Sequence, residues 1–178
     1  SYMFHDATAF NQALNQWNVS KVTNMSWLFC NASSFDQPLD TWNTRNVVSM
    51  VGMFRCATSF NQPLENWDIC NVYSIIGMFI NAHSFNQPLN NWNVCNVMWM
   101  SMVFWRAYSF NQPLNHWNVS NVVLMRGMFY QASKFNQSLI NWNVEKVECM
   151  KDMFEGSGCC FAYISELEQS WPQLKQNR

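Results

Sequence analysis

The sequence predicts an α/β solenoid of about six 25-residue repeats, each with a short strand and a short helix, closed by a C-terminal capping helix. The first observation is a constant period of 25 residues, at which one phenylalanine and one tryptophan recur. These residues are Phe10, Phe35, Phe60, Phe85, Phe110 and Phe135, and Trp17, Trp42, Trp67, Trp92, Trp117 and Trp142. The second observation is the apolar spacing inside each repeat, and the third is the change of pattern after Phe154. A fixed period of this size is typical of solenoids, in which each unit packs on its neighbours.

Within each repeat the apolar residues change from strand-like to helix-like spacing. We number the 25 positions as columns, with the recurring phenylalanine as column 1. Columns 8 and 10 carry Trp and Val, as in Trp92 and Val94, and this alternation favours a brief strand. Columns 13, 16, 19, 20 and 23 place apolar residues at helical offsets, as in Val122, Met125, Met128, Phe129 and Ala132. Proline in column 4 of four repeats predicts a bend after the helix.

One repeat alone buries too little apolar surface to offset the entropy of ordering 25 residues, so stability must come from contacts between repeats. We therefore expect both ends of the stack to differ from its middle. Residues 1–154 are predicted to form the repeat solenoid, with a truncated first repeat, and residues 155–178 a C-terminal capping segment. The spacing in this segment predicts an amphipathic helix over the last repeat, with a docking helix for a partner as the alternative. Its apolar face would consist of Phe161, Ile164, Leu167 and Trp171.

Asparagine and glutamine also recur in register. Columns 2 and 9 carry Asn or Asp, and column 3 carries Gln, in all six repeats. An amide repeated at every level can bond the backbone of its own turn and its counterparts above and below. These columns predict structural ladders, and a carbohydrate-binding use of the same amides is the alternative.

Composition and charge argue against several classes of function. The net charge of −1 at pH 7, without any Lys/Arg cluster, gives no electrostatic footprint for nucleic acid. No apolar run approaches the roughly 18–20 residues that span a bilayer, so no membrane insertion is expected. The N-terminus has no charged stretch followed by an apolar core, so we expect no signal peptide or anchor in this chain.

No arrangement typical of an enzyme or a cofactor site stands out. The three histidines, His5, His83 and His116, lie beside no Ser/His/Asp or Cys/His set, and the acidic residues form no pair suited to general acid–base work. The seven cysteines lack metal-ligand spacing, so we predict no metal, no cofactor and no enzymatic activity. Free thiols are the favoured state, and a disulfide between Cys70 and Cys95, which share column 11, is the alternative.

The columns that differ most between repeats are 14, 15, 17, 18, 21 and 22, opposite the apolar stripe of the predicted helix. Charged and polar residues are typical of such a face, but the middle repeats carry apolar and aromatic residues there. If exposed, these form one contiguous patch of the residue types that interfaces favour. The predicted partner-binding residues are Tyr73, Ile76, Ile80, Met98, Trp99, Met102, Trp105, Val123, Leu124, Arg126 and Tyr130.

These columns predict a non-enzymatic recognition module that binds a protein or peptide through the outward helix face. Arg55, Arg106 and Arg126 would supply polar contacts at the rim of the patch. The variability is either natural or selected from a randomised library. The alternatives are contact with another layer, self-association, drift without function, and a structural spacer or adhesin stalk whose rod shape is the function.

The pattern FNQPL-x-x-W-N-V-x-x-V-x-x-M-x-x-MF-x-x-A resembles the bacterial surface protein repeat of the BspA-like group, which is related to leucine-rich repeats. The resemblance covers roughly residues 3–154, although the period of 25 is slightly shorter than that of the family. It implies a leucine-rich-repeat-like solenoid and roles in adhesion or recognition. It also implies a cell-surface or extracellular location, as in listerial and mycoplasmal surface lipoproteins, and supplies no catalytic residues.

Overall fold

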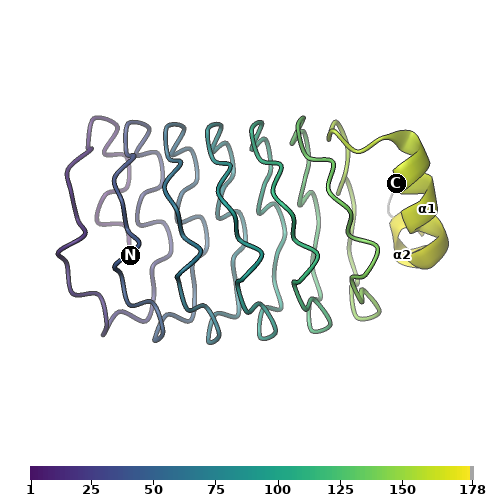
Figure 1. Ribbon diagram of the computed structural model, residues 1–178, viewed down its shortest axis with the longest axis horizontal. Helices are drawn as coiled ribbons and strands as arrows, with labels where there is room; N and C mark the ends of the chain where they lie inside the picture. The colour runs from purple at the N-terminus through teal and green to yellow at the C-terminus, as the bar shows by residue number, and fades with distance from the viewer. Residues whose placement is uncertain (177–178) are drawn as a thin grey trace.

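The computed structural model describes residues 1–176, which form an elongated coil of stacked rungs (Figure 1). Each rung is one 25-residue period, so that residues 25 apart in the sequence lie side by side, as Ser49 and Ser74 do. The chain begins in a partial rung at one end of the long axis and finishes at the other end in two helices (Figure 1). These are α1 (Phe161–Ser170) and α2 (Pro172–Gln176).

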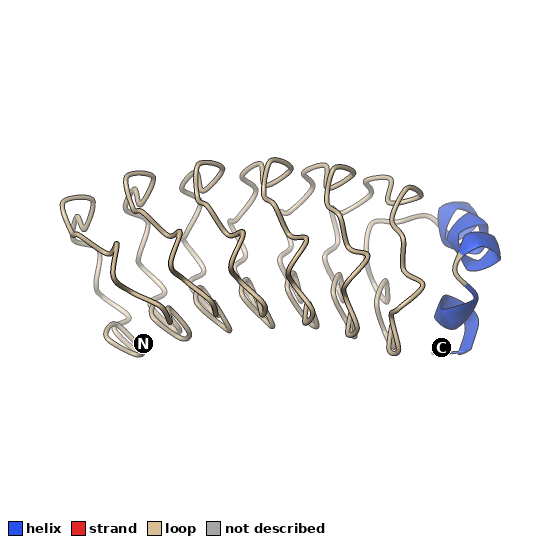
Figure 2. Cartoon of the chain, turned by 90° about the horizontal axis from the view of Figure 1, so that it is seen from below, coloured by secondary structure: helices blue, strands red, loops and turns tan. Residues whose placement is uncertain are grey.

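The rungs contain neither the helix nor the strand that the sequence analysis predicted, so the prediction of an α/β, leucine-rich-repeat-like solenoid is wrong. Over residues 1–160 the chain forms turns and irregular segments, and α1 and α2 are the only helices among the described residues (Figure 2). The β pairing in this range is reduced to isolated parallel bridges in column 15, one per rung. These bridges join Asn24, Ser49, Ser74, Trp99, Leu124 and Cys149.

Left-handed backbone in columns 18 and 22 is the physical reason why no helix forms. Every rung has φ between 53° and 67° at both columns, as at Gly52 and Asn81. A helix needs negative φ at each residue, whereas a turn with positive φ at its third residue favours glycine or asparagine there. The chain accordingly makes four-residue β-turns, in which Met53 N–H donates to Met50 O at 3.2 Å and Ala57 N–H to Phe54 O at 3.0 Å.

The remaining N–H groups of this segment point to the next rung. Gly52 N–H donates to Ile76 O at 2.8 Å, and Phe54 N–H donates to Met78 O at 2.9 Å. Bonds to the next rung and bonds within the rung therefore alternate along columns 18 to 23. This alternation satisfies the buried backbone without a helix or a continuous sheet.

Apart from the exposed Trp17 of the first rung, columns 8 and 10 face the interior, as their alternation predicts, but they form no strand because their backbone closes turns. Trp67 N–H donates to Leu64 O at 3.1 Å within its own rung, and Val72 N–H donates to Ile69 O at 2.9 Å. The buried indole N–H of Trp67 reaches back to Leu39 O of the preceding rung at 3.0 Å. The same indole contact repeats in five rungs at 2.8–3.0 Å.

The core consists of aromatic stacks that run along the coil. The column 20 phenylalanines of neighbouring rungs have ring centroids 5.6–5.8 Å apart between Phe29 and Phe154. Within a rung, Phe54 of this stack and Phe60 of column 1 have centroids 4.0 Å apart. Columns 13, 16, 19, 20 and 23 are buried in the middle rungs, so the spacing identified the interior although it suggested the wrong local structure.

The amide columns form ladders, as the sequence analysis predicted. Asn61 Oδ1 accepts hydrogen bonds from Asn86 N–H at 2.9 Å and from Gln87 Nε2 at 3.2 Å. The same arrangement links column 2 of each rung to columns 2 and 3 of the next, from Asn11 onward. Column 9 bonds the backbone of its own turn, as where Asn93 Oδ1 accepts from Cys95 N–H at 3.3 Å.

The C-terminal segment closes the stack by continuing its tryptophan column. The rings of Trp142 and Trp171 are 6.4 Å apart, against 6.3 Å between Trp117 and Trp142 in successive rungs. Helix α1 begins at Phe161, where the spacing predicts, and buries Leu167, but it ends at Ser170, so that Trp171 lies outside it and α2 follows. The side chain of Phe161 lies outside the described residues. The rung geometry runs beyond the expected boundary at residue 154, as far as residue 158. Residues 177–178 of the predicted segment also lie outside the described residues.

Candidate functional site

The variable columns form a surface that we call the variable face, which consists of columns 14, 15, 17, 18, 21 and 22. In its middle rungs, Tyr73, Met98 and Trp99 are the most exposed large apolar residues, at 39%, 39% and 37%. Tyr73 and Trp99 pack edge to face, with ring centroids 5.5 Å apart. The backbone fixes this cluster, because Met98 N–H and Trp99 N–H both donate to Tyr73 O, at 3.0 and 3.3 Å.

A second aromatic cluster joins the rung of Met98 and Trp99 to the next rung of the variable face. The rings of Trp105 and Tyr130 stack with centroids 3.9 Å apart. Gly127 makes room for Trp105, since a Cβ at residue 127 would lie 2.6 Å from the Trp105 ring. Both aromatic residues are half-buried, as are Ile76, Met102, Val123 and Leu124 of the predicted site.

One predicted site residue does not belong to the exposed surface. Ile80 is only 7% exposed, because its side chain folds back over Gly77 of the same rung. A Cβ at residue 77 would lie 2.7 Å from Ile80 Cδ1, so the glycine leaves the space that Ile80 fills. The sequence analysis also placed all these columns on an outward helix face, which does not exist; columns 15 and 17 are partly interior, with Ser74 and Ser101 buried.

Three arginines lie on the variable face, and each is exposed. The Arg55 guanidinium carbon is 5.9 Å from the ring centroid of Trp27, within cation–π range. Arg106 Nε donates to Gln131 Oε1 at 2.9 Å. Arg126 Nη2 lies 3.9 Å from a carboxylate oxygen of Asp152 while its side chain remains 56% exposed.

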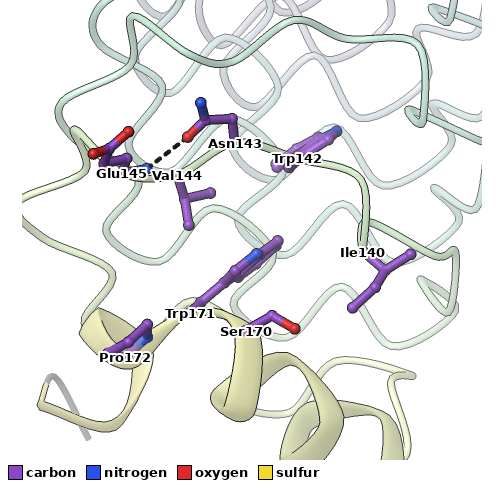
Figure 3. Close-up of a pocket in the computed structure, with 8 residues that line it drawn as sticks. All are labelled: Ile140, Trp142, Asn143, Val144, Glu145, Ser170, Trp171 and Pro172. Carbon is purple, nitrogen blue, oxygen red and sulfur yellow. Dashed lines mark hydrogen bonds between the residues drawn. The ribbon is translucent and has the colours of Figure 1, made fainter.

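A groove of about 470 Å³ lies at the junction of the last rung and the capping segment (Figure 3). One side consists of Ile140, Trp142, Asn143, Val144 and Glu145, and the other of Ser170, Trp171 and Pro172. The sequence analysis missed this groove. Its signal is column 6, which holds Asn15, Asp40, Glu65, Asn90 and Asn115 in the other repeats but Ile140 here.

The possible metal ligands among the described residues form no cluster. No group of three or more His, Cys, Asp and Glu residues among residues 1–176 could hold a metal ion. The cysteines of this range are free thiols, including Cys70 and Cys95. Burial raises the pKa of Cys159 to about 11, and burial also raises the pKa of Cys30, so neither is an activated thiolate.

In the described part of the chain, no helix is both long enough and apolar enough to cross a membrane.

Comparison with known proteins assigns a family. No curated protein and no solved structure matches the sequence. Residues 1–105 and 62–167 each match the family described as "Mycoplasma protein of unknown function, DUF285", which fits the mycoplasmal part of the resemblance. Because the two matches together span most of the chain, it belongs to this repeat family.

Proposed function

We propose that the protein is a non-enzymatic recognition module that binds a protein or peptide through the variable face. The observation that carries this proposal is the exposure of Tyr73, Met98 and Trp99 on adjacent rungs, beside the half-buried pair Trp105 and Tyr130. Apolar side chains that stand together on a surface, held by rigid backbone, are typical of binding sites.

The contrast between variable and repeated columns supports the same proposal. The repeated residues fill the interior and the amide ladders, so they are explained by folding alone. Side chains such as Tyr73 and Met98 contribute little to the core, and stability gives no reason for two large apolar groups there. Tyrosine, tryptophan, methionine and arginine are the residue types that interfaces enrich.

We further propose that the repeats are of the BspA-like type and that the protein acts at a cell surface. The repeat pattern quoted above and the mycoplasmal family support this proposal. A rod that presents one face over several rungs suits adhesion or recognition at such a location.

The proposal is tested by comparing two variants that each lose three large, partly exposed apolar side chains. The first replaces Tyr73, Met98 and Trp99 by serine, and the control replaces Trp17, Tyr108 and Ile140, which are similarly exposed in other columns. Each protein is immobilised and challenged with a display library of random 16-residue peptides and with detergent-solubilised surface proteins of a mycoplasma. Ligands retained by the wild type and the control but lost by the first variant support the proposal.

Two results would contradict it. Ligand capture that is equal for all three proteins would show that the variable face is not the binding surface. Concentration-dependent assembly of the wild type, without any captured ligand and lost in the first variant, would show that the face mediates self-association. Circular dichroism on each variant verifies that the coil is folded.

A further inference from the structure

We infer that the partner is an acidic, amphipathic peptide helix that lies along the coil axis on the variable face. This inference rests on the proposed function and specifies the chemistry of its ligand. The first observation is the charge of the middle rungs of the face: between Thr23 and Gln131 its six columns contain Arg55, Arg106 and Arg126 but no Asp, Glu or Lys. The acidic residues of these columns lie only at the two ends of the coil.

The arginines stand where a ligand on the aromatic clusters would meet them. Arg106 directly follows Trp105 in the sequence, and its Nε contact with Gln131 holds it beside the Trp105–Tyr130 stack. Arg126 Nη2 lies 3.9 Å from a carboxylate oxygen of Asp152 in the last rung, a long ion pair that leaves the arginine exposed. A guanidinium presents several N–H donors in a fixed plane, which matches a carboxylate of the partner. Charge complementarity therefore selects an acidic ligand over a basic one.

The spacing of the rungs selects a helical ligand. Equivalent phenylalanines in column 20, next to the variable columns, are 5.6–5.8 Å apart from rung to rung. An α-helix rises about 5.4 Å per turn, so a helix parallel to the coil axis places one turn on each rung. An extended strand repeats its side chains on one face about every 6.6–6.8 Å and falls out of register sooner. Apolar residues at positions i, i+3, i+4 and i+7 of the helix then meet Tyr73, Met98 and Trp99 in turn.

The ligand is thus a peptide with a short apolar stripe flanked by Asp or Glu. The stripe covers the apolar clusters of the middle rungs, and the carboxylates meet Arg106 and Arg126. Arg45 offers a matched control, because it is exposed but lies in column 11, outside the variable face.

A selection from a display library of random 16-residue peptides tests the inference. Peptides are enriched on the wild-type protein and counter-selected against the variant with Tyr73, Met98 and Trp99 replaced by serine. We expect the enriched peptides to carry Asp or Glu beside apolar residues at helical spacing. Synthetic copies should bind about tenfold more weakly to the protein with Arg106→Glu and Arg126→Glu, and equally well to Arg45→Glu.

The possible failures can be told apart. Enriched peptides that depend on the variable face but are neutral or basic would overturn the acidic partner and leave the proposed function intact. Acidic peptides whose affinity is unchanged by the two arginine substitutions would also overturn the pairing with Arg106 and Arg126 and leave the proposed function intact. Peptides with extended rather than helical circular dichroism in the complex would overturn the helical geometry. A library without any face-dependent peptide would contradict both the inference and the proposed function.

Discussion

Replacing Ser74 by alanine should raise the free energy of unfolding, although the residue is in the middle of the coil. Ser74 is 1% exposed, and its hydroxyl has no hydrogen-bond partner among the described residues. One rung earlier, the equivalent hydroxyl of Ser49 lies 2.9 Å from the hydroxyl of Ser26. The residue that corresponds to Ser26 beside Ser74 is Val51, which offers no polar group.

The structure allows both the sign and the size of the effect to be worked out. A buried hydroxyl without a partner costs about 1–3 kcal/mol, and alanine removes it while leaving the Cβ in place. We expect Ser74→Ala to stabilise the protein by about 1–2 kcal/mol. Ser49→Ala should destabilise it by about 1 kcal/mol, because the buried hydroxyl of Ser26 then loses its partner. A change of 1 kcal/mol corresponds to roughly 2–4 °C in Tm for a chain of this size.

Urea and thermal unfolding of the full chain, followed by circular dichroism, measure these changes. A double-mutant cycle adds a second test: Val51→Ser should be more favourable by about 1 kcal/mol when Ser74 is present than in the Ser74→Ala background. Equal destabilisation by Ser74→Ala and Ser49→Ala, or the absence of coupling to Val51→Ser, would refute the reasoning. It would show that the Ser74 hydroxyl is hydrogen-bonded in solution.

Three further predictions concern the ladders, the cap and the thiols. Asn86→Ala should lower the free energy of unfolding by about 1–2 kcal/mol in urea titrations, since its Oδ1 accepts bonds from the next rung at 2.8 and 3.2 Å. Asn136→Ala in the last rung, whose Oδ1 accepts one side-chain bond at 3.4 Å, should change it by less than half as much. Trp171→Ala should lower the free energy of local unfolding at the cap by about 3–5 kcal/mol. Amide hydrogen exchange should then become faster in the last rung and in the two helices. An equal increase over all rungs would contradict the capping role. Because burial raises its pKa to about 11, Cys159 should resist alkylation by iodoacetamide at a pH of about 8 and become reactive as the pH approaches 11. The exposed Cys160 should be alkylated at both pH values. Equal alkylation rates of the two thiols, measured by mass spectrometry, would refute this prediction.

The sequence predicted the period, the interior columns and the amide ladders, because each depends on which residues recur rather than on the local backbone. It also predicted a helix from Phe161, because the apolar residues that follow have helical spacing. It did not predict the shape of the rung. The apolar offsets of 3, 6, 7 and 10 fit a helix and a series of four-residue β-turns equally well. The discriminating signal was the placement of glycine and asparagine four columns apart, at Gly52, Gly77 and Gly127 in column 18 and at Asn31 and Asn81 in column 22. These residues tolerate positive φ, which a helix excludes.

The candidate site could be predicted only in part, for the same reason. On a helix all six variable columns would point outward, and Ile80 would be exposed. In the turns, neighbouring columns differ in burial, and Ile80 fills the space that Gly77 leaves. The groove at the cap depends on how α1 meets the last rung, and one apolar residue, Ile140, was its sole trace in the sequence.

The alternation of backbone hydrogen bonds within a rung and between rungs affects how the number of repeats can change in evolution. Every rung presents the same donors to its successor and the same acceptors to its predecessor, as Gly52 and Ile76 do. Gain or loss of a whole 25-residue unit therefore preserves each type of contact, whereas a shift of one residue would break all of them at once. Gene duplication and unequal recombination can lengthen or shorten the coil, and with it the variable face, without any redesign of the interior.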